Sequence, residues 1–255
     1  MKVTFLGTGT SHGVPMIACE CATCRSDDPR DTRLRPSIYL ETARARVLVD
    51  AGPDLRQQSL VHRIRGVDAI LFTHGHADHI LGMDDVRRFN AVQRGAMPCY
   101  GDPQTLDDIR RMFAYVFDPA TPKGGGLPLL ELVAIAGPFC IADLEVQPIP
   151  IFHGRRPILG YRTGAFAYLT DCSRIPDEAW PLLGNLEVLV LDALRVRPHP
   201  THFSLDEAIA SAARIGARRT YFTHMCHDLA HAETCARLPA GMTLAHDGLV
   251  LDLEQ

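Results

Sequence analysis

The sequence predicts an α/β fold in which β-sheets are covered by helices. Short apolar or β-branched runs separated by turn residues recur along the chain, and amphipathic segments with helix caps lie between them. Many strands come first, and an alternation of strands and helices follows, as in sheets with helices on their outer faces. Because the 255 residues contain no linker or repeat, we expect one domain over residues 1–255.

The predicted strands are runs of apolar and β-branched residues bounded by turn-forming residues. They occupy residues 2–6, 37–41, 46–49, 69–73, 97–100, 145–151, 160–163, 165–170, 188–191, 220–223 and 249–253.

Apolar residues at helical spacing predict three main helices, at residues 82–93, 102–117 and 205–215. In the second, Asp102 is the predicted N-cap and Pro103 takes the first helical position. In the third, Ser204 and Glu207 form a capping box, and Gly216 stands where a C-cap glycine belongs.

The composition excludes several classes of protein. Hydrophobic residues make up 46% and charged residues 22% of the chain, which is typical of a globular protein. A net charge of −4 disfavours a long nucleic acid as partner, because phosphate binding usually needs a basic protein. No apolar stretch predicts a membrane span, and the first apolar run is too short for a signal peptide, so we expect a cytoplasmic protein.

Polar side chains stand where four of the apolar runs end. The run at residues 69–72 leads into Thr-His-Gly-His-Ala-Asp-His at 73–79, and later runs lead to His153, Asp171 and His224. If these runs are neighbouring strands, the groups converge on one rim and can form a rigid metal site. Imidazoles and carboxylates are the usual ligands of zinc, iron and manganese. The alternative, a His-rich surface turn at 73–79, would not explain the three later groups.

With these groups in this order, the chain resembles the metallo-β-lactamase-fold hydrolases, whose H-x-H-x-D-H motif it carries at residues 74–79. The resemblance covers essentially the whole chain and implies a four-layer αββα sandwich. It also implies two divalent metal ions, manganese or zinc, with these ligands: His74, His76 and His153 for the first ion, Asp78, His79 and His224 for the second, and Asp171 for both. Two such ions activate a water molecule as the nucleophile and draw charge from a phosphoryl or carbonyl oxygen.

A second group of candidate metal ligands lies near the N-terminus, where Cys19, Cys21 and Cys24 form a C-x-C-x-x-C string. Three thiolates this close suit a closed tetrahedral zinc site that needs a fourth ligand. His227 is the candidate for that ligand, and Cys226 is its rival. Buried packing and a redox pair are the alternatives for these cysteines, although the middle cysteine argues against a redox pair.

These cysteines and the late H-x-x-H narrow the resemblance to the phosphoribosyl cyclic phosphate phosphodiesterases of phosphonate breakdown. That likeness implies that Cys19, Cys21, Cys24 and His227 hold one structural zinc ion, which ties the N-terminal loop to the loop beside His224. The remaining cysteines have no metal-ligand spacing and are expected to be small buried residues: Cys99, Cys140, Cys172 and Cys235.

His202, just before the third helix, resembles the histidine that protonates the leaving alkoxide in the phosphodiesterase branch. A sugar alkoxide leaves poorly unless it gains a proton as the P–O bond breaks, and histidine suits that task. The alternative is an ordinary loop histidine, which is what we expect of His199. We expect Asp78 to orient His202 as well as to bind metal. Asp50 and Asp192 follow apolar strands and are expected to fix metal-binding histidines through their second ring nitrogen.

The sequence thus predicts a two-metal phosphodiesterase that opens a small cyclic sugar phosphate or a related nucleotide-like diester. The acidic net charge and the lack of an inserted arm disfavour a ribonuclease Z-like nuclease. His202 counts against a thioester or lactone hydrolase, because a thiolate leaves without help. The complete ligand set disfavours an iron-dependent redox relative and a non-catalytic binding module. No membrane partner is expected, and a homodimer is allowed.

Overall fold

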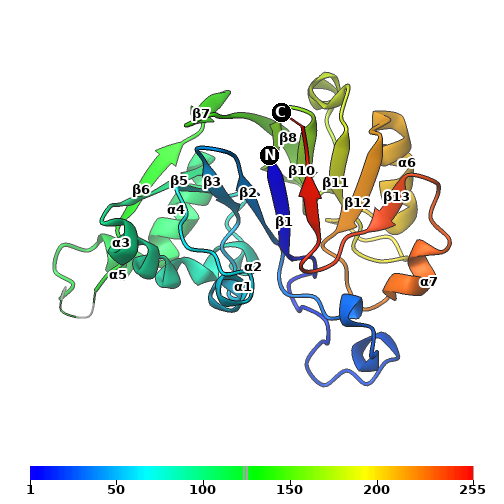
Figure 1. The fold of residues 1–255 in the computed structure, drawn as a ribbon, viewed down its shortest axis with the longest axis horizontal. Helices are drawn as coiled ribbons and strands as arrows, with labels where there is room; N and C mark the ends of the chain where they lie inside the picture. The colour runs from blue at the N-terminus through cyan, green and yellow to red at the C-terminus, as the bar shows by residue number, and fades with distance from the viewer. Residues whose placement is uncertain (123, 125, 255) are drawn as a thin grey trace.

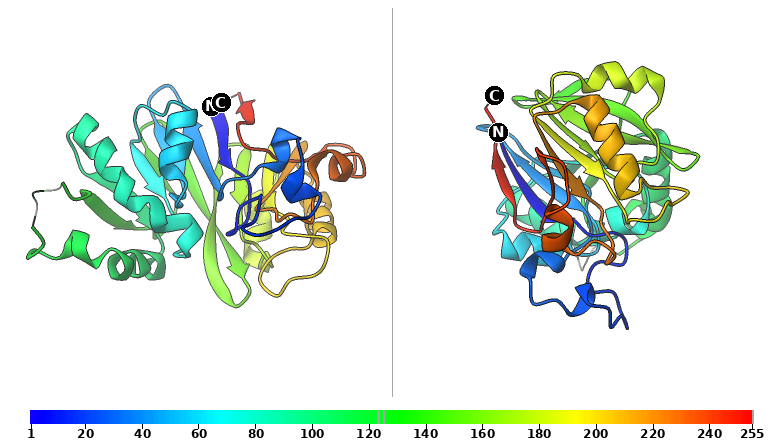
Figure 2. Two further views of the ribbon diagram at one scale, coloured as in Figure 1. Left: turned by 90° about the horizontal axis from the view of Figure 1, so that it is seen from below. Right: turned by 90° about the vertical axis from the view of Figure 1, so that its right-hand side faces the viewer.

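Two β-sheets packed face to face form the centre of the molecule, and helices flank both outer faces (Figures 1 and 2). The computed structural model describes residues 1–122, 124 and 126–254. Within these residues the first sheet has seven strands, in the order β14 (Val250–Asp252), β1 (Lys2–Gly7), β2 (Ser37–Glu41), β3 (Arg46–Val49), β4 (Ala69–Leu71), β5 (Met97–Gly101) and β6 (Leu130–Ala134).

The second sheet also has seven strands in the described part of the chain. Their order is β13 (Met242–Leu244), β12 (Arg219–Thr223), β11 (Val188–Asp192), β10 (Phe166–Leu169), β9 (Arg156–Thr163), β8 (Leu144–His153) and β7 (Phe139–Ile141). Strands β3 to β6 are parallel in the first sheet, and β10 to β13 are parallel in the second. Parallel neighbours bring their carboxyl ends to one edge of a sheet, and this edge carries the polar groups described below.

The helices cover the outer face of each sheet. Those packed against the first sheet or its loops are α1 (Leu55–Val61), α2 (Ala77–Ile80), α3 (Arg87–Gln93), α4 (Pro103–Met112) and α5 (Ala114–Phe117), and those beside the second are α6 (Leu205–Ile215) and α7 (His231–Cys235). Short 3₁₀ helices occupy Thr23–Arg25, Pro29–Asp31, Leu81–Val86 and Asp177–Leu183. None of the described helices is long and apolar enough to span a membrane.

Buried apolar side chains fill the spaces between these layers. One cluster, which includes Val47 and Tyr168, lies between the two sheets. A second joins the first sheet to its helices, for example Ile70 to Leu106, and a third joins the second sheet to α6, for example Leu189 to Ala208. Because side chains alternate between the faces of a strand, each sheet is apolar on both faces. The predicted four-layer αββα sandwich is confirmed.

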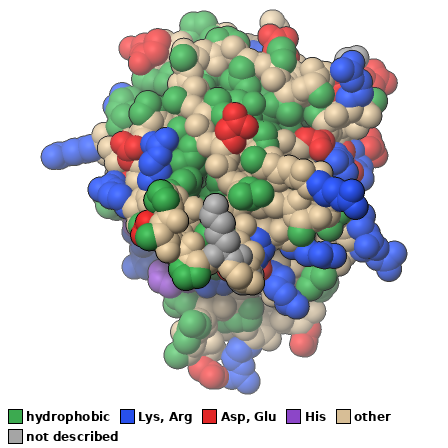
Figure 3. All heavy atoms as spheres, turned by 90° about the vertical axis from the view of Figure 1, so that its left-hand side faces the viewer, with side chains coloured by type: hydrophobic (Ala, Val, Ile, Leu, Met, Phe, Trp, Pro, Cys, Tyr) green, Lys and Arg blue, Asp and Glu red, His purple; other side chains and the backbone are tan. Residues whose placement is uncertain are grey.

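The face of the molecule at β6 and β7 shows apolar side chains gathered over its upper part, with basic side chains to their right (Figure 3). Here the chain passes from the edge of one sheet to the edge of the other. The rings of Tyr100 and Phe139 stack with centroids 4.7 Å apart and, with half-buried Ile135, close this end of the core between the sheets.

The sequence-based element predictions are mostly confirmed, with differences at segment ends. The helix at 205–215 has its predicted capping box and a left-handed C-cap at Gly216. The segment at 82–93 is a 3₁₀ helix followed by α3, and the helix that Asp102 caps breaks at Phe113, whose backbone is not helical. The prediction omitted β6, β7, β13, α1, α2 and α7, all of which are short.

Candidate metal centre

Strand ends of both sheets bring the predicted ligands together. The ligands form two groups, and within each group the candidate ligand atoms lie within 4.8 Å of one another. The first group is His74, His76 and His153, and the second is Asp78, His79, Asp171 and His224. Most of these side chains are buried, but His76 is exposed, so the first group is open to solvent.

Asp171 lies between the two groups. Its Oδ1 is 3.8 Å from His74 Nε2 in the first group and 3.2 Å from His224 Nε2 in the second. Its Oδ2 is 3.2 Å from His79 Nε2. A carboxylate in this position can serve both groups, as the resemblance implies.

Four buried ring nitrogens of the centre have no hydrogen-bond partner, namely Nε2 of His74, Nε2 of His79, and both Nδ1 and Nε2 of His224. A buried polar atom without a partner costs about 1–3 kcal/mol, so such atoms are rare in folded proteins. The three Nε2 atoms lie close to the carboxylate of Asp171. The donor set therefore fits two divalent cations bound by nitrogen and oxygen atoms.

The charges of the centre also suit cations. Burial lowers the pKa of His74 well below its usual value, and the imidazole of His79 adds to this. Burial alone would raise the pKa of Asp171, but the surrounding imidazoles, His224 first, hold it well below its usual range. Burial would likewise lower the pKa of His79, yet three nearby carboxylates raise it well above its usual value. The same carboxylates would attract a metal cation.

Three of the buried histidines have a hydrogen-bonding neighbour at Nδ1 that fixes the ring. These contacts join His74 to Thr73 Oγ1 (3.1 Å), His79 to Asp50 Oδ2 (2.7 Å) and His153 to the Thr201 carbonyl oxygen (2.8 Å). Nδ1 of His224 lies 3.5 Å from Asp192 Oδ1 but makes no hydrogen bond to it. Such contacts turn Nε2 toward the centre. Asp50 and Asp192 stand where the sequence predicts them. Thr73 and Thr201 were not predicted, because a hydroxyl and a backbone carbonyl leave no pattern in a sequence.

Three residues of the centre have left-handed backbone conformations although none is a glycine. The φ angles of Asp50, Asp171 and His224 are 64°, 56° and 60°, and each residue lies within two positions of a strand end. This conformation costs about 1–3 kcal/mol per residue and persists where the surrounding structure holds it in place. Backbone strain of this kind clusters at functional sites.

Close backbone packing fixes the loop that carries the H-x-H-x-D-H motif. A Cβ atom at Gly52 would lie 2.0 Å from the carbonyl oxygen of Asp78, and one at Gly75 would lie 2.6 Å from the side chain of Asp108. Asp108, on α4, also accepts a hydrogen bond from Arg156 at 2.6 Å. These contacts hold α4 against the motif loop and against β9, and the sequence offered no signal for them.

His202 lies beside both groups. Its ring centroid is 4.5 Å from that of His153 and 4.7 Å from that of His224, and the ring is buried. The sequence predicts that Asp78 orients His202, but the carboxylate in contact with it is Asp192, whose Oδ1 is 3.3 Å from His202 Nδ1. Asp78 instead lies beside the imidazoles of the second group.

The cysteine string forms a second candidate metal site. The sulfur atoms of Cys19, Cys21 and Cys24 lie 3.1, 3.4 and 3.5 Å from Nδ1 of His227. The rival fourth ligand, Cys226, is not in this group, and its sulfur accepts a hydrogen bond from the backbone of residue 228. A backbone N–H of residue 24 lowers the pKa of Cys21, which favours the thiolate. Three sulfurs and one nitrogen fit a tetrahedral zinc ion.

A fully buried arginine joins the cysteine loop to the segment that follows β12. Arg33 donates hydrogen bonds to the carbonyl oxygens of Cys226 and Leu229, and it forms an ion pair with Asp31 at 3.1 Å. Asp31 also accepts a hydrogen bond from the backbone N–H of His231 at 2.8 Å. The cysteine loop is therefore tied to the His224 segment by protein groups as well as by the candidate zinc ligands.

The other cysteines differ in burial. Cys99 and Cys172 are buried as predicted, and Cys235 is partly buried. The prediction is wrong for Cys140, which is exposed because it lies on the edge strand β7 and its neighbours there, Phe139 and Ile141, take the inward positions.

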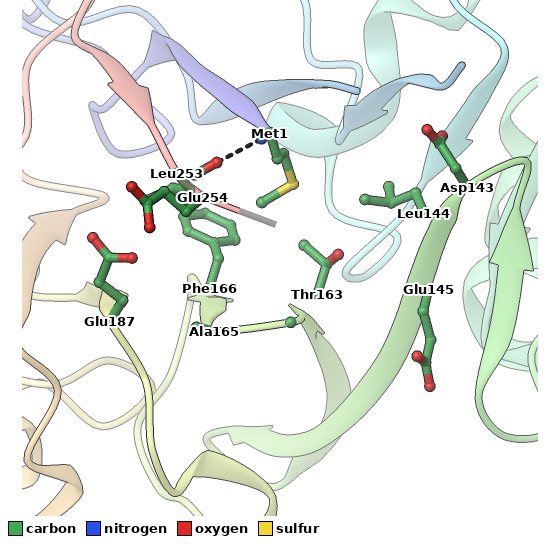
Figure 4. A pocket seen from close by; sticks show the side chains of 11 residues that line it. Met1, Asp143, Leu144, Glu145, Thr163, Ala165, Phe166, Glu187, Leu253 and Glu254 are labelled. Carbon is green, nitrogen blue, oxygen red and sulfur yellow. Dashed lines mark hydrogen bonds between the residues drawn. The ribbon is translucent and has the colours of Figure 1, made fainter. Parts of the chain in front are cut away.

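A hollow of about 350 Å³ lies away from these groups, and Figure 4 shows the side chains that line it. The residues that line it include Met1, Phe166, Asp143, Glu145 and Glu187, but none of the predicted site residues. Because the hollow contains none of the candidate metal ligands, the candidate site remains at the strand ends.

The chain is similar to known proteins over most of its length. The family model described as the beta-lactamase superfamily domain matches residues 45–225, which include both groups of the candidate metal centre. The chain belongs to the beta-lactamase superfamily. A solved structure described as a new diphosphatase from the PhnP family is 45% identical, with a TM-score of 0.93, and the match covers 99% of this chain and 98% of that one. The chain is therefore also a member of the PhnP family, and it is a metallo-β-lactamase-fold hydrolase.

Two further relatives are less similar. Zn²⁺-bound PqqB from Methylobacterium extorquens is 22% identical, with a TM-score of 0.81 and coverage of 99% of this chain and 100% of that one, and it shows the shared fold. The octanoyltransferase of Porphyromonas gingivalis is 39% identical over 98% of this chain. This chain spans 51% of that protein, so about half of the octanoyltransferase has no counterpart here.

Proposed function

We propose that this hydrolase is a two-metal phosphodiesterase that opens a small cyclic sugar phosphate or a nucleotide-like diester. The observation that carries the proposal is the position of His202 beside the two groups of ligands that Asp171 joins. A diester with an alkoxide leaving group needs charge neutralisation at phosphorus and a proton for the departing oxygen. The 45% likeness to a PhnP-family diphosphatase supports chemistry at phosphorus.

The proposal assigns zinc or manganese ions to the two groups. The ligands would be His74, His76 and His153 for one ion, Asp78, His79 and His224 for the other, and Asp171 for both. A bound pair of such ions supplies an activated water molecule and withdraws charge from the phosphoryl oxygens. A structural zinc ion is assigned to Cys19, Cys21, Cys24 and His227.

His202 is proposed as the general acid. Nδ1 of His202 lies 3.3 Å from Asp192 Oδ1; with Asp192 as the acceptor, the imidazolium would carry its other proton on Nε2 and could pass it to the leaving oxygen. In that step the P–O bond breaks, its electron pair stays on the departing oxygen, and that oxygen takes the proton. The same oxygen of Asp192 lies 3.5 Å from Nδ1 of His224, so its charge would act on both rings.

The other functions considered fit the site less well. A thioester has a thiolate leaving group that needs no acid, which leaves His202 without a task. The acidic net charge of −4 does not favour a nuclease that grips a long RNA. The diphosphatase description belongs to the PhnP-family relative, and a phosphoanhydride substrate on the same metal ions is the competing possibility within phosphorus chemistry.

Initial rates on a panel of substrates test the proposal. The panel contains a ribose cyclic phosphate, bis(p-nitrophenyl) phosphate, a nucleoside diphosphate sugar and a p-nitrophenyl thioester, each assayed with metal-loaded enzyme and with Asp171→Ala. We expect kcat/KM to be highest for the cyclic phosphate and to fall at least about 10³-fold in the variant. Preferred turnover of the thioester or the phosphoanhydride would overturn the proposal.

A further inference from the structure

His199, which the sequence predicts to be an ordinary loop histidine, stands beside the proposed general acid. Its ring centroid lies 5.2 Å from that of His202, at an interplanar angle of 47°. His202 is buried, whereas His199 is only partly buried. The two rings thus lead from the solvent to the metal centre.

The loop that carries His199 is held rigid by its own contacts. The guanidinium of Arg195 donates hydrogen bonds to the carbonyl oxygens of Arg197 (3.1 Å) and Pro198 (2.8 Å). Prolines at 198 and 200 restrict the backbone on both sides of the histidine. The carbonyl oxygen of Thr201 accepts a hydrogen bond from Nδ1 of His153, which anchors the loop to the first group of the centre. The loop therefore presents His199 in a fixed place.

The hydrogen bonds of His199 also fix its tautomer. The backbone N–H of Thr201 donates to His199 Nδ1 at 3.4 Å, and the Thr201 hydroxyl lies 3.2 Å from the same atom. A backbone N–H can only donate, so Nδ1 is the acceptor, and the neutral ring carries its proton on Nε2. Burial and the neighbouring His202 lower the pKa of His199, which favours this neutral form. Among the described residues we find no acceptor for the Nε2 proton.

We propose that His199 determines substrate specificity by donating its Nε2–H to a second oxygen of the leaving group, next to the oxygen that His202 protonates. This inference rests on the proposed phosphodiesterase function. Two adjacent donors match two neighbouring oxygens, such as those of a sugar or another polyol. A leaving group that has a single oxygen can accept from only one of these donors, so it gains no second hydrogen bond. The substrate class is therefore a diester whose leaving alcohol carries a neighbouring hydroxyl or ring oxygen.

The test uses two cyclic phosphates, a ribose cyclic phosphate and ethylene phosphate, which lacks the additional oxygens of the sugar. We expect His199→Ala to lower kcat/KM for the ribose substrate about tenfold, the value of roughly one hydrogen bond, and to leave ethylene phosphate unchanged. His199→Gln keeps an N–H donor and should recover most of the loss. His62→Ala, which removes a partly buried histidine outside both metal groups, is the matched control.

An equal loss of kcat/KM on both substrates would mean that His199 only supports His202. An unchanged kcat/KM on both would mean that His199 has no part in substrate binding. Either result overturns the inference and leaves the proposed function intact. If the metal-loaded wild-type enzyme hydrolyses neither diester, the proposed function fails and the inference fails with it.

Discussion

The Oδ2 atom of Asp50 lies 2.7 Å from Nδ1 of His79, and both side chains are completely buried. The other carboxylate oxygen of Asp50 accepts the backbone N–H of Thr73 at 2.9 Å. Asp50 comes from the end of β3, whereas His79 comes from the helix that follows β4, so the contact joins two neighbouring strand ends. It leaves Nε2 of His79 free to face Asp171.

Replacing Asp50 should weaken metal binding without removing a ligand. Asp50→Asn exchanges one acceptor oxygen for an N–H donor that cannot accept from Nδ1, so the ring loses its orientation. We expect metal affinity at the second group to fall about 10- to 100-fold, as measured by competition with a chelator. Asp68→Asn, which removes part of a partly exposed ion pair with Arg46, is the control. Unchanged affinity in Asp50→Asn would show that the contact does not support the metal site.

The role of His202 predicts a dependence on the leaving group. His202→Ala should lower kcat for a diester with an alkoxide leaving group about 10²- to 10⁴-fold, because that oxygen must gain a proton as it departs. The same variant should hardly change kcat for bis(p-nitrophenyl) phosphate, whose p-nitrophenolate leaves without a proton. Metal content should stay as in the wild type. Equal losses on the two substrates would exclude a general acid and point to a structural role.

The buried Arg33 predicts a large effect on stability. Arg33→Met leaves Asp31 without its cation and removes the hydrogen bonds to the Cys226 and Leu229 carbonyl oxygens. We expect the free energy of unfolding to fall by about 3–5 kcal/mol in urea titrations of the metal-loaded protein. Arg30→Met, which removes an exposed arginine of the same loop, should leave the urea midpoint almost unchanged. A loss below about 1 kcal/mol for Arg33→Met would contradict this account.

Asp247 predicts a pH dependence of stability. Burial raises its pKa to about 7, although it accepts hydrogen bonds from the Thr8 hydroxyl and the Leu34 backbone. Between the usual value of about 4 and this raised value, the folded chain holds a proton that the unfolded chain has lost, so stability falls as pH rises.

Asp247→Asn should remove the pH-dependent part of the stability that Asp247 contributes. It should keep both hydrogen bonds, since an amide can donate to the Thr8 hydroxyl and accept from the Leu34 backbone. Relative to the variant, the wild type should lose about 2–3 kcal/mol of unfolding free energy between pH 5 and pH 8. Parallel pH profiles of the two proteins would refute the raised pKa.

The sequence predicts those parts of the molecule that have a local pattern. The caps of α6 are visible in Ser204 and Glu207, and most strands are visible as apolar runs. The ligand groups could be predicted because the H-x-H-x-D-H motif and three later polar residues at the ends of apolar runs follow the order of a known family. Contacts between distant segments leave no such pattern. Asp192 was therefore not assigned to His202, and Arg33 was not singled out at all.

The number of metal ions per chain tests the central claim most directly. Native mass spectrometry of protein incubated with zinc or manganese should show three ions on the wild type, two at the Asp171 centre and one at the cysteine site. Asp171→Ala should retain the ion at the cysteine site and lose at least one of the other two. A wild-type chain that never takes up more than one ion, or an Asp171→Ala variant that still binds three, would contradict the account.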